Sequence, residues 1–451
     1  MYNIKIEPDY EKIHEWELYS KTIMTEYKQC IDEGLDVEEY KELFEAVSKM
    51  PCGKAKEKMA DAIFEIVSNA KTKDGYKYNE PSDLEEIKRL RKAHKFDKKE
   101  LDEKALKSKI EGAWYGRIIG CLLGKPIEGC WKEHIWEMLK DNGNYPMNRY
   151  ILFNKFSDAM KEKYPWLQHK CFADRVSYMP FDDDTNYVVL AQELINKYGR
   201  DFTARDMSQA WLAMQPKDSY CTAERVAFKN FVNGLEPPAS AVYKNAYREW
   251  IGAQIRGDYF GYINPGNTEI AAEMAFRDAS ISHVKNGIYG EMWASAMIAA
   301  AVVCDDIIDI IYAGLAEIPH TSRLYEEVEL VINLYKNGAT KEECFSKIYE
   351  KWNDHDFHHW CHTISNAMVV AASLLYGEGD FSKSICIAVE AGFDTDCNGA
   401  TVGSIVGIRG GIDSISDEWK KPLNNTLETT IFGVGKVDIL ERAKMTLNHI
   451  K

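Results

Sequence analysis

Apolar residues recur at helical rather than strand spacing along most of this chain. Near the start, a group of apolar residues falls three or four positions apart, which is the period of one helical face: Tyr40, Leu43, Phe44, Val47 and Met50. Alternating polar and apolar positions, the mark of strands, are rare after residue 105. The stretches 185–194, 269–279 and 291–303 each predict a helix instead.

The amino-acid composition of the chain changes near residue 105. Before it, Lys and Glu are dense, and Ser82 is a predicted N-cap for a helix that begins near Leu84. After it, glycine, alanine and apolar residues become frequent. We therefore predict an all-α fold with two parts: a compact multi-helix domain over residues 105–451 and a helical N-terminal extension over residues 1–104.

Two stretches carry a glycine at every fourth position. They are Gly112, Gly116, Gly120 and Gly124, and Gly399, Gly403, Gly407 and Gly411. Helical residues four apart share a face, so each stripe lets another backbone approach closely. Arg117, Lys125 and Arg409 interrupt these stretches and argue against a membrane dimer motif. Because glycine costs up to about 1 kcal/mol at a helix-interior site, we expect central, tightly packed helices close to the acidic clusters described next.

Those clusters are Asp182–Asp183–Asp184, followed by Thr185, and Asp394–Thr395–Asp396. Each opens a predicted helix of apolar and small residues. Carboxylates this dense repel one another and lose hydration when buried, so they need a counter-charge. Hard divalent cations supply one, because they prefer oxygen ligands. A metal site built from both segments is the leading interpretation, and a run of helix N-caps is the alternative for either segment alone.

Composition limits the classes of partner and location. The 451 residues suffice for a large core, and 45% hydrophobic content is typical of globular proteins. A net charge of -15 argues against a nucleic-acid backbone as the main partner. The N-terminus has no apolar signal-peptide core, and the most apolar run, Trp293 to Cys304, is too short to span a membrane. Eleven scattered cysteines without CxxC pairs indicate reduced thiols, so we expect a cytoplasmic protein.

Other candidate residues have simpler explanations. Glu128 follows the first glycine stripe and could face the same cavity, although alone it is typical of a turn or surface residue. His358 and His362 share a helical face in a histidine-rich segment, but the HExxH pattern is absent, which favours a packed or surface cluster over a zinc site. Cys361 and Cys397 are candidate nucleophiles without a recognisable third, orienting group.

Taken in order, these motifs resemble the ADP-ribosylglycohydrolase family, of the type that activates dinitrogenase reductase. The resemblance runs from residue 112 to about residue 411 and rests on these segments: Gly112–Ala113–Trp114–Tyr115–Gly116, Gly124 with Glu128, Asp183–Asp184–Thr185, the segment from Asp278 to His283, and Gly392–Phe393–Asp394–Thr395–Asp396 with the stripe after it. It implies an all-α domain with two divalent ions, usually magnesium and sometimes manganese. It also implies hydrolysis of the glycosidic bond between ADP-ribose and an acceptor.

The resemblance also assigns roles to residues. It implies metal ligation by Asp183 and Asp184 from one segment and by Asp394 and Asp396 from the other, with Glu128 contacting the metal-bound water or the substrate. Two positions depart from the family pattern: Asp182 stands where Thr or Ser is common, and Cys397 where Thr is common. Both usual residues offer a hydroxyl to the metal, whereas a thiol is a poor magnesium ligand.

The resulting hypothesis is hydrolysis of an N- or O-ribosyl bond by metal-positioned water. The candidate metal ligands are Asp182, Asp183, Asp184, Asp394, Asp396 and Cys397, and the candidate catalytic residues are Glu128, Asp183 and Asp396. The expected substrate is an ADP-ribosylated protein or a small ADP-ribosyl or ribosyl compound. Three alternatives stay open: hydrolysis of another small glycoside, a non-catalytic binding homologue, which Cys397 favours, and an N-terminal extension that docks a partner.

Overall fold

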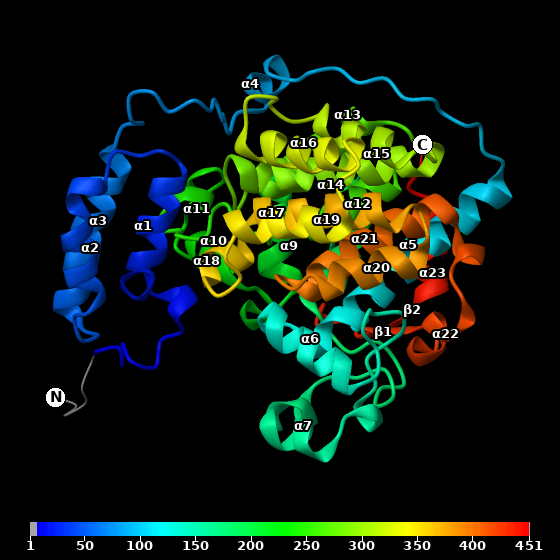
Figure 1. The fold of residues 1–451 in the computed structure, drawn as a ribbon. Helices are drawn as coiled ribbons and strands as arrows, with labels where there is room; N and C mark the ends of the chain where they lie inside the picture. The colour runs from blue at the N-terminus through cyan, green and yellow to red at the C-terminus, as the bar shows by residue number, and fades with distance from the viewer. Residues whose placement is uncertain (1–6, 451) are drawn as a thin grey trace.

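The computed structural model of the chain describes residues 7–450, and helices make up most of it (Figure 1). The N-terminal part contains α1 (Ile23–Asp32), α2 (Lys41–Ser48), α3 (Lys54–Asn69) and α4 (Leu84–Arg89). In residues 7–450 the strands form one small antiparallel sheet, in which β1 (Thr426–Glu428) pairs with β2 (Lys436–Asp438). The predicted all-α fold is confirmed.

Nineteen further helices build the body of the molecule. They are α5 (Glu103–Gly124), α6 (Lys132–Asp141), α7 (Asp158–Lys163), α8 (Asp183–Tyr198), α9 (Ala204–Met214), α10 (Thr222–Val232), α11 (Ala239–Val242), α12 (Asp258–Tyr262), α13 (Thr268–Ala279), α14 (Asn286–Val303), α15 (Ile307–Leu315), α16 (Arg323–Lys336), α17 (Lys341–Lys351), α18 (Phe357–Cys361), α19 (Thr363–Gly377), α20 (Phe381–Glu390), α21 (Thr395–Gly410), α22 (Asp417–Lys420) and α23 (Ile439–Leu447). The predicted helices at 185–194, 269–279 and 291–303 lie inside α8, α13 and α14.

One predicted helix start is displaced by a residue. The N-cap of α4 is Asp83, whose side chain accepts a hydrogen bond from the backbone N–H of Glu86. The hydroxyl of Ser82, the predicted cap, instead accepts a bond from the backbone N–H of Lys285 in the body, 203 positions away. Asp and Ser are about equally good N-caps, so the local sequence did not decide between them.

The two glycine stripes face each other at the centre of the molecule. Helices α5 and α21 run antiparallel, so that Gly112 lies against Gly407, Gly116 against Gly403 and Gly120 against Gly399 (Figure 1). A Cβ atom added at any of these positions would meet the backbone carbonyl of its partner well inside van der Waals contact. The predicted tight packing of central helices is therefore present, as a backbone-to-backbone contact between α5 and α21.

Helix α14 packs beside this pair and is buried along its whole length, from Asn286 to Val303. Its sequence is rich in alanine and apolar residues on every face, as a fully enclosed helix requires. Within residues 7–450, none of the helices combines the length and the apolar character that a membrane crossing requires.

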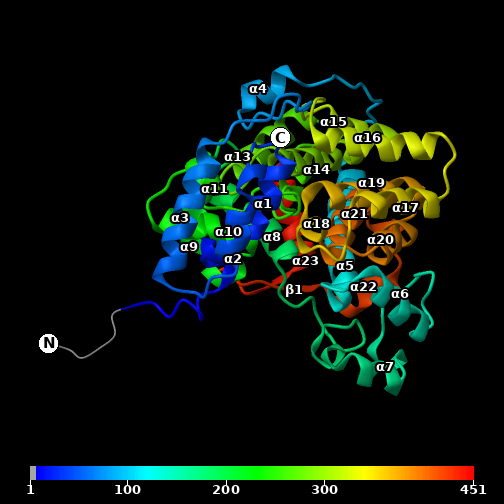
Figure 2. The same cartoon turned by 60° about the vertical axis from the view of Figure 1, so that its left-hand side comes forward.

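The N-terminal part has a small core of its own and is joined to the body by polar contacts. Phe44, Ile63 and other apolar residues of α1–α3 form a separate buried cluster. Both views place α1 against α10 and α11, and the chain from α4 to α5 crosses the top of the body (Figures 1 and 2). Arg248 of the body is buried between the carboxylates of Glu26 and Glu33, at 2.7 and 2.6 Å. The domain boundary at residue 104 stays a prediction.

The close approach of α5 and α21 predicts that Gly116→Ala destabilises the protein strongly. The added methyl group would press on the carbonyl of Gly403, which belongs to a rigid helix and cannot rotate away. We expect the free energy of unfolding, measured by urea denaturation with circular dichroism, to fall by about 3 kcal/mol.

Gly410→Ala is the matched control. Gly410 ends the partner helix α21 at an exposed position, and a Cβ there would meet Ser414, which belongs to a short exposed turn rather than to a packed helix. This change should lower the free energy of unfolding by less than about 1 kcal/mol, because the exposed turn can shift and alanine favours the helix. Equal stability of both variants would contradict the packing argument.

Candidate metal centre

The packing of α5 on α21 brings the two acidic segments together. Asp394 is the N-cap residue of α21, and the hydroxyl of Thr395 donates a 3.0 Å hydrogen bond to the carbonyl of Gly124 at the end of α5. Asp182 caps α8, accepting a 3.0 Å bond from the backbone N–H of Asp184. The first turns of α8 and α21 therefore meet at the end of α5, where helix N-termini favour negative charge.

Two groups of potential ligand atoms result. In the first, one atom each from Cys121, Asp182, Asp184 and Asp396 lies within 4.8 Å of the others. In the second, the same holds for Asp394, Asp396 and Cys397. Asp396 belongs to both groups, so five of the predicted ligands from the two distant segments lie close together, whereas the sixth, Asp183, is in neither group. Their role as metal ligands stays a prediction.

Arg117 of α5 holds Asp184 in place through a buried ion pair. Its guanidinium lies 2.7 Å from Oδ1 of Asp184 and 3.2 Å from Oδ2 of Asp258, and all three side chains are buried. The second oxygen of Asp184, Oδ2, is buried without a hydrogen-bond partner among residues 7–450. An orphaned carboxylate oxygen costs free energy unless a cation or a donor reaches it, and a divalent ion would meet that need.

Lys125 provides a second fixed positive charge. Its ammonium group forms an ion pair with the carboxylate of Asp182, which is 3% exposed. Burial would raise the pKa of Asp182, but the Lys125 ammonium outweighs it and holds that pKa below its usual range. The extra charge that Asp182 adds relative to the family pattern is thus balanced within the protein.

Burial and repulsion between neighbouring carboxylates raise the pKa values of the other acidic residues in the centre. Burial, and then the charge of Glu128, raises the pKa of Asp394 to about 8. Burial and neighbouring carboxylates likewise raise the pKa values of Asp183, Asp184 and Asp396 well above the ordinary aspartate value. Like charges in a low-dielectric site disfavour ionisation until a cation arrives. The donor set of carboxylate oxygens therefore fits hard divalent ions in chemistry and in charge.

Exposure separates two kinds of residue in this centre. Glu128 and Asp183 are partly exposed, so they face the solvent from which a substrate would come. The other predicted ligands are buried beneath them: Asp182, Asp184, Asp394, Asp396 and Cys397. The pKa of Glu128 is raised by burial and by the charge of Asp182, and its carboxyl lies within hydrogen-bonding reach of Asp396.

The cysteines at the centre are poor nucleophiles. Burial raises the pKa of Cys361, Cys397 and Cys121 well above the ordinary thiol value, and nearby aspartates raise it further. Nucleophilic cysteines need the opposite shift. Cysteine catalysis is therefore not supported.

Sequence reasoning missed Arg117, Cys121 and Lys125 as parts of the centre. These residues are spaced four apart, one position after Gly116, Gly120 and Gly124, with the first two on α5 and Lys125 as the C-cap residue that follows it. They therefore form the face next to the glycine stripe and point to the same neighbours. The two basic residues had been noted only as interruptions of an apolar helix, and their regular spacing was the signal that could have placed them.

The histidine segment gathers potential ligands but is arranged for hydrogen bonding. Asp32, His358 and His362 bring ligand atoms within 4.8 Å of one another. However, the indole N–H of Trp250 donates to Nδ1 of His358 at 3.0 Å, so the proton of this neutral ring is on Nε2, which lies 2.8 Å from Asp32. A metal needs that nitrogen free of its proton. The structure favours the packed cluster over a zinc site.

Comparison with known proteins gives one family. Residues 102–447 match the family model described as ADP-ribosylglycohydrolase. No curated protein matches the chain. Among the solved structures that match is one described as an ADP-ribosylglycohydrolase-related protein complex. It has 15% sequence identity and a TM-score of 0.40, and the alignment covers 77% of this chain and 98% of that one.

The raised pKa values predict an unusual pH dependence for the metal-free protein. Between the unfolded aspartate pKa and the folded value of about 8 for Asp394, the folded state holds protons that the unfolded state has released. Stability should therefore fall as pH rises from about 6 to about 8, by a few degrees in thermal midpoint. The Asp182–Lys125 pair contributes no slope there, because the pKa of Asp182 is lowered.

The measurement is a thermal melt by differential scanning fluorimetry at each pH, with a chelator and then with magnesium. Magnesium should remove most of the loss at the higher pH. Asp394→Asn should make the slope of the chelated protein's profile shallower, while the other carboxylates with raised pKa values keep its sign. A wild-type midpoint that rises with pH in the presence of chelator would contradict the strained-carboxylate interpretation.

Proposed function

The chain belongs to the ADP-ribosylglycohydrolase family, and we propose that it is a metal-dependent hydrolase that cleaves an N- or O-glycosidic bond of an ADP-ribosylated substrate. The family indicates glycohydrolase activity on ADP-ribosyl compounds. The observation that supports the finer proposal is the convergence of Asp182–Asp184 and Asp394–Asp396 beside Glu128. Solvent-facing carboxylates above a buried set of ligand atoms are what hydrolysis at a metal centre needs.

Two magnesium ions, with manganese as the alternative, would act as Lewis acids at this site and lower the pKa of a water molecule. The first group of ligand atoms, with Asp182, Asp184 and Asp396, would hold one ion, and the second group, with Asp394, Asp396 and Cys397, the other. In the first group Lys125 competes for Asp182. Asp184 and Asp396 are therefore the stronger candidates for that ion.

Glu128 is suited to move a proton. Its pKa is raised by burial and by Asp182, so a proton is exchanged nearer to neutral pH than at an ordinary glutamate. Being partly exposed, it can reach a water molecule or the ribosyl leaving group. Asp183, also partly exposed, lies beside it and would carry a negative charge once a cation is bound. That charge would stabilise the positive charge that develops on the ribose in an oxocarbenium-like transition state.

The substrate is proposed to be an ADP-ribosylated protein or a small ADP-ribosyl compound, and the location cytoplasmic. The cysteines support the cytoplasmic location, because all eleven are free in the structure and most are buried. The test incubates the protein in parallel with an ADP-ribosylated protein and with small ribosides, and measures the products by chromatography. Release of free ADP-ribose would support this proposal, and hydrolysis of the ribosides alone would indicate another glycoside as the substrate.

Two substitutions should separate metal binding from proton transfer. Asp396→Asn removes a charge shared by both ligand groups, so turnover should fall by at least about a thousandfold and Mn²⁺ binding should weaken. Glu128→Gln should lower turnover by about 10²–10⁴-fold while Mn²⁺ still binds, because only proton transfer is lost. Turnover is measured as ADP-ribose release and binding by titration calorimetry.

Asp417→Asn is the control for removing one negative charge, since the Asp417 side chain is 99% exposed at the start of α22. It should turn over substrate as the wild type does. Full activity of Asp396→Asn, or of wild-type protein after stringent chelation, would refute the mechanism.

A further inference from the structure

A strained turn leads into Asp394. Phe393, the residue before it, has a φ of +54°, in the left-handed region that bulky side chains rarely adopt. Gly392 also has a positive φ, of +80°, and the Phe393 ring is completely buried. Such a conformation persists only where surrounding contacts impose it, and strain of this kind clusters at functional sites.

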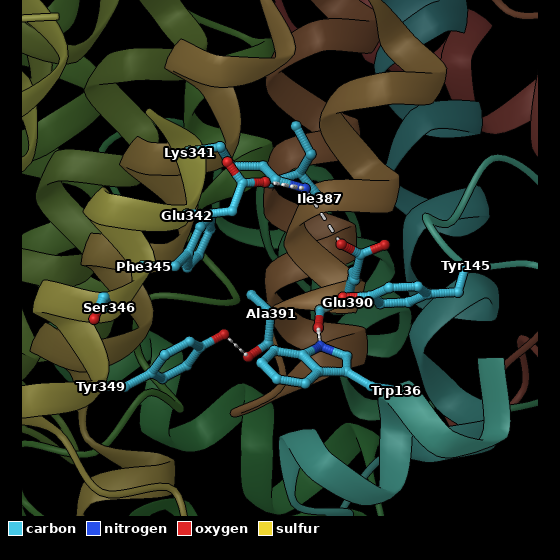
Figure 3. Close-up of a pocket in the computed structure, with 10 residues that line it drawn as sticks. All are labelled: Trp136, Tyr145, Lys341, Glu342, Phe345, Ser346, Tyr349, Ile387, Glu390 and Ala391. Carbon is cyan, nitrogen blue, oxygen red and sulfur yellow. Dashed lines mark hydrogen bonds and ion pairs between the residues drawn. The ribbon is translucent and has the colours of Figure 1, made fainter. Parts of the chain in front are cut away.

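Two aromatic side chains supply those contacts (Figure 3). The hydroxyl of Tyr349 donates to the carbonyl of Ala391 at 2.8 Å, and the indole N–H of Trp136 donates to the carbonyl of Glu390 at 2.9 Å. The Tyr349 ring also stacks on Phe393, with ring centroids 6.0 Å apart and planes 13° from parallel. The backbone before the turn and the side chain within it are thus held by residues of α6 and α17.

The far side of the turn is held as well. The backbone N–H of Asp394 donates to Oδ1 of Asn366 at 3.2 Å, and the same oxygen accepts a 2.8 Å bond from the amide of Asn398. Asp394 is therefore fixed between an amide network on one side and an aromatic clamp on the other. The aromatic clamp is the side that also borders open space, a cavity of about 270 Å³ between α6, α17 and α20.

We propose that Tyr349 and Trp136 are positioning residues that place Asp394 in the metal centre by holding Phe393 in its left-handed conformation. The inference rests on the proposed function, since it assumes that Asp394 binds metal. Without the Tyr349 hydroxyl, the Ala391 carbonyl loses its donor and the turn can relax toward an unstrained conformation. Asp394 would move with it, because only one peptide unit separates it from Phe393.

The test compares two tyrosine-to-phenylalanine variants of the full-length chain. Tyr349→Phe removes the hydrogen bond to Ala391 but keeps the ring on Phe393. Tyr376→Phe is the matched control, because the Tyr376 hydroxyl donates to the carbonyl of Ala339 at the same distance, 2.8 Å, at the start of α17. Mn²⁺ affinity is measured by titration calorimetry, and folding by the thermal midpoint of the chelated proteins.

The expected result is a Kd for Mn²⁺ that rises about fivefold to tenfold in Tyr349→Phe and stays at the wild-type value in Tyr376→Phe. The two variants should melt alike, since each loses one hydrogen bond of the same kind. A Trp136→Phe variant, which loses the bond to Glu390, should also weaken Mn²⁺ binding.

Three results would overturn the inference. Unchanged Mn²⁺ affinity in Tyr349→Phe would show that the hydroxyl does not position Asp394, and it would leave the proposed function intact. Equal weakening in both tyrosine variants would show a general loss of structure. Failure of the wild-type protein to bind Mn²⁺ would instead refute the proposed function, on which the inference rests.

Discussion

The contact between the backbones of α5 and α21 is the constraint on which the rest of this structure depends. Because glycines face glycines in the observed register, the two helices approach each other backbone against backbone. That register ends with Gly124 against Thr395, and so it places the first turn of α21 at the end of α5. A slip of one helical turn would move Asp396 by about 5.4 Å and separate the acidic segments.

The sequence predicted both stripes and both acidic clusters, but not how they pair. The glycine spacing along one helix shows which of its faces lacks side chains. It does not show which other helix packs on that face, because tertiary packing decides that. For the same reason Arg117 and Lys125 were taken only as polar interruptions, because their partners Asp184 and Asp182 lie about sixty residues further along the chain. Likewise Ser82 and Asp83 are equivalent caps locally, and only the contact of Ser82 with Lys285 separates them.

The fixed cations explain how so much negative charge is folded into one place. Arg117 is held in position by two buried carboxylates and offers its charge to Asp184 on one oxygen only. Lys125 compensates Asp182. In the part of the chain that the structure describes, Asp183, Asp394 and Asp396 have no such fixed cation in an ion pair, and burial and then neighbouring carboxylates raise their pKa values. The protein therefore supplies counter-charge to Asp182 and to one oxygen of Asp184, and the other carboxylates are left without one.

The N-terminal extension is tied to this body by charges as well, and that bears on the idea that it docks a partner. Glu33 is paired with both Arg248 and Lys285, and Glu80 with Arg323, which also holds Glu249. These groups are buried or nearly so, and removing one side of a buried pair leaves an uncompensated charge. A surface whose charges are already satisfied inside the chain is not free for another protein. These buried pairs therefore serve the stability of the chain itself and are not available to a partner.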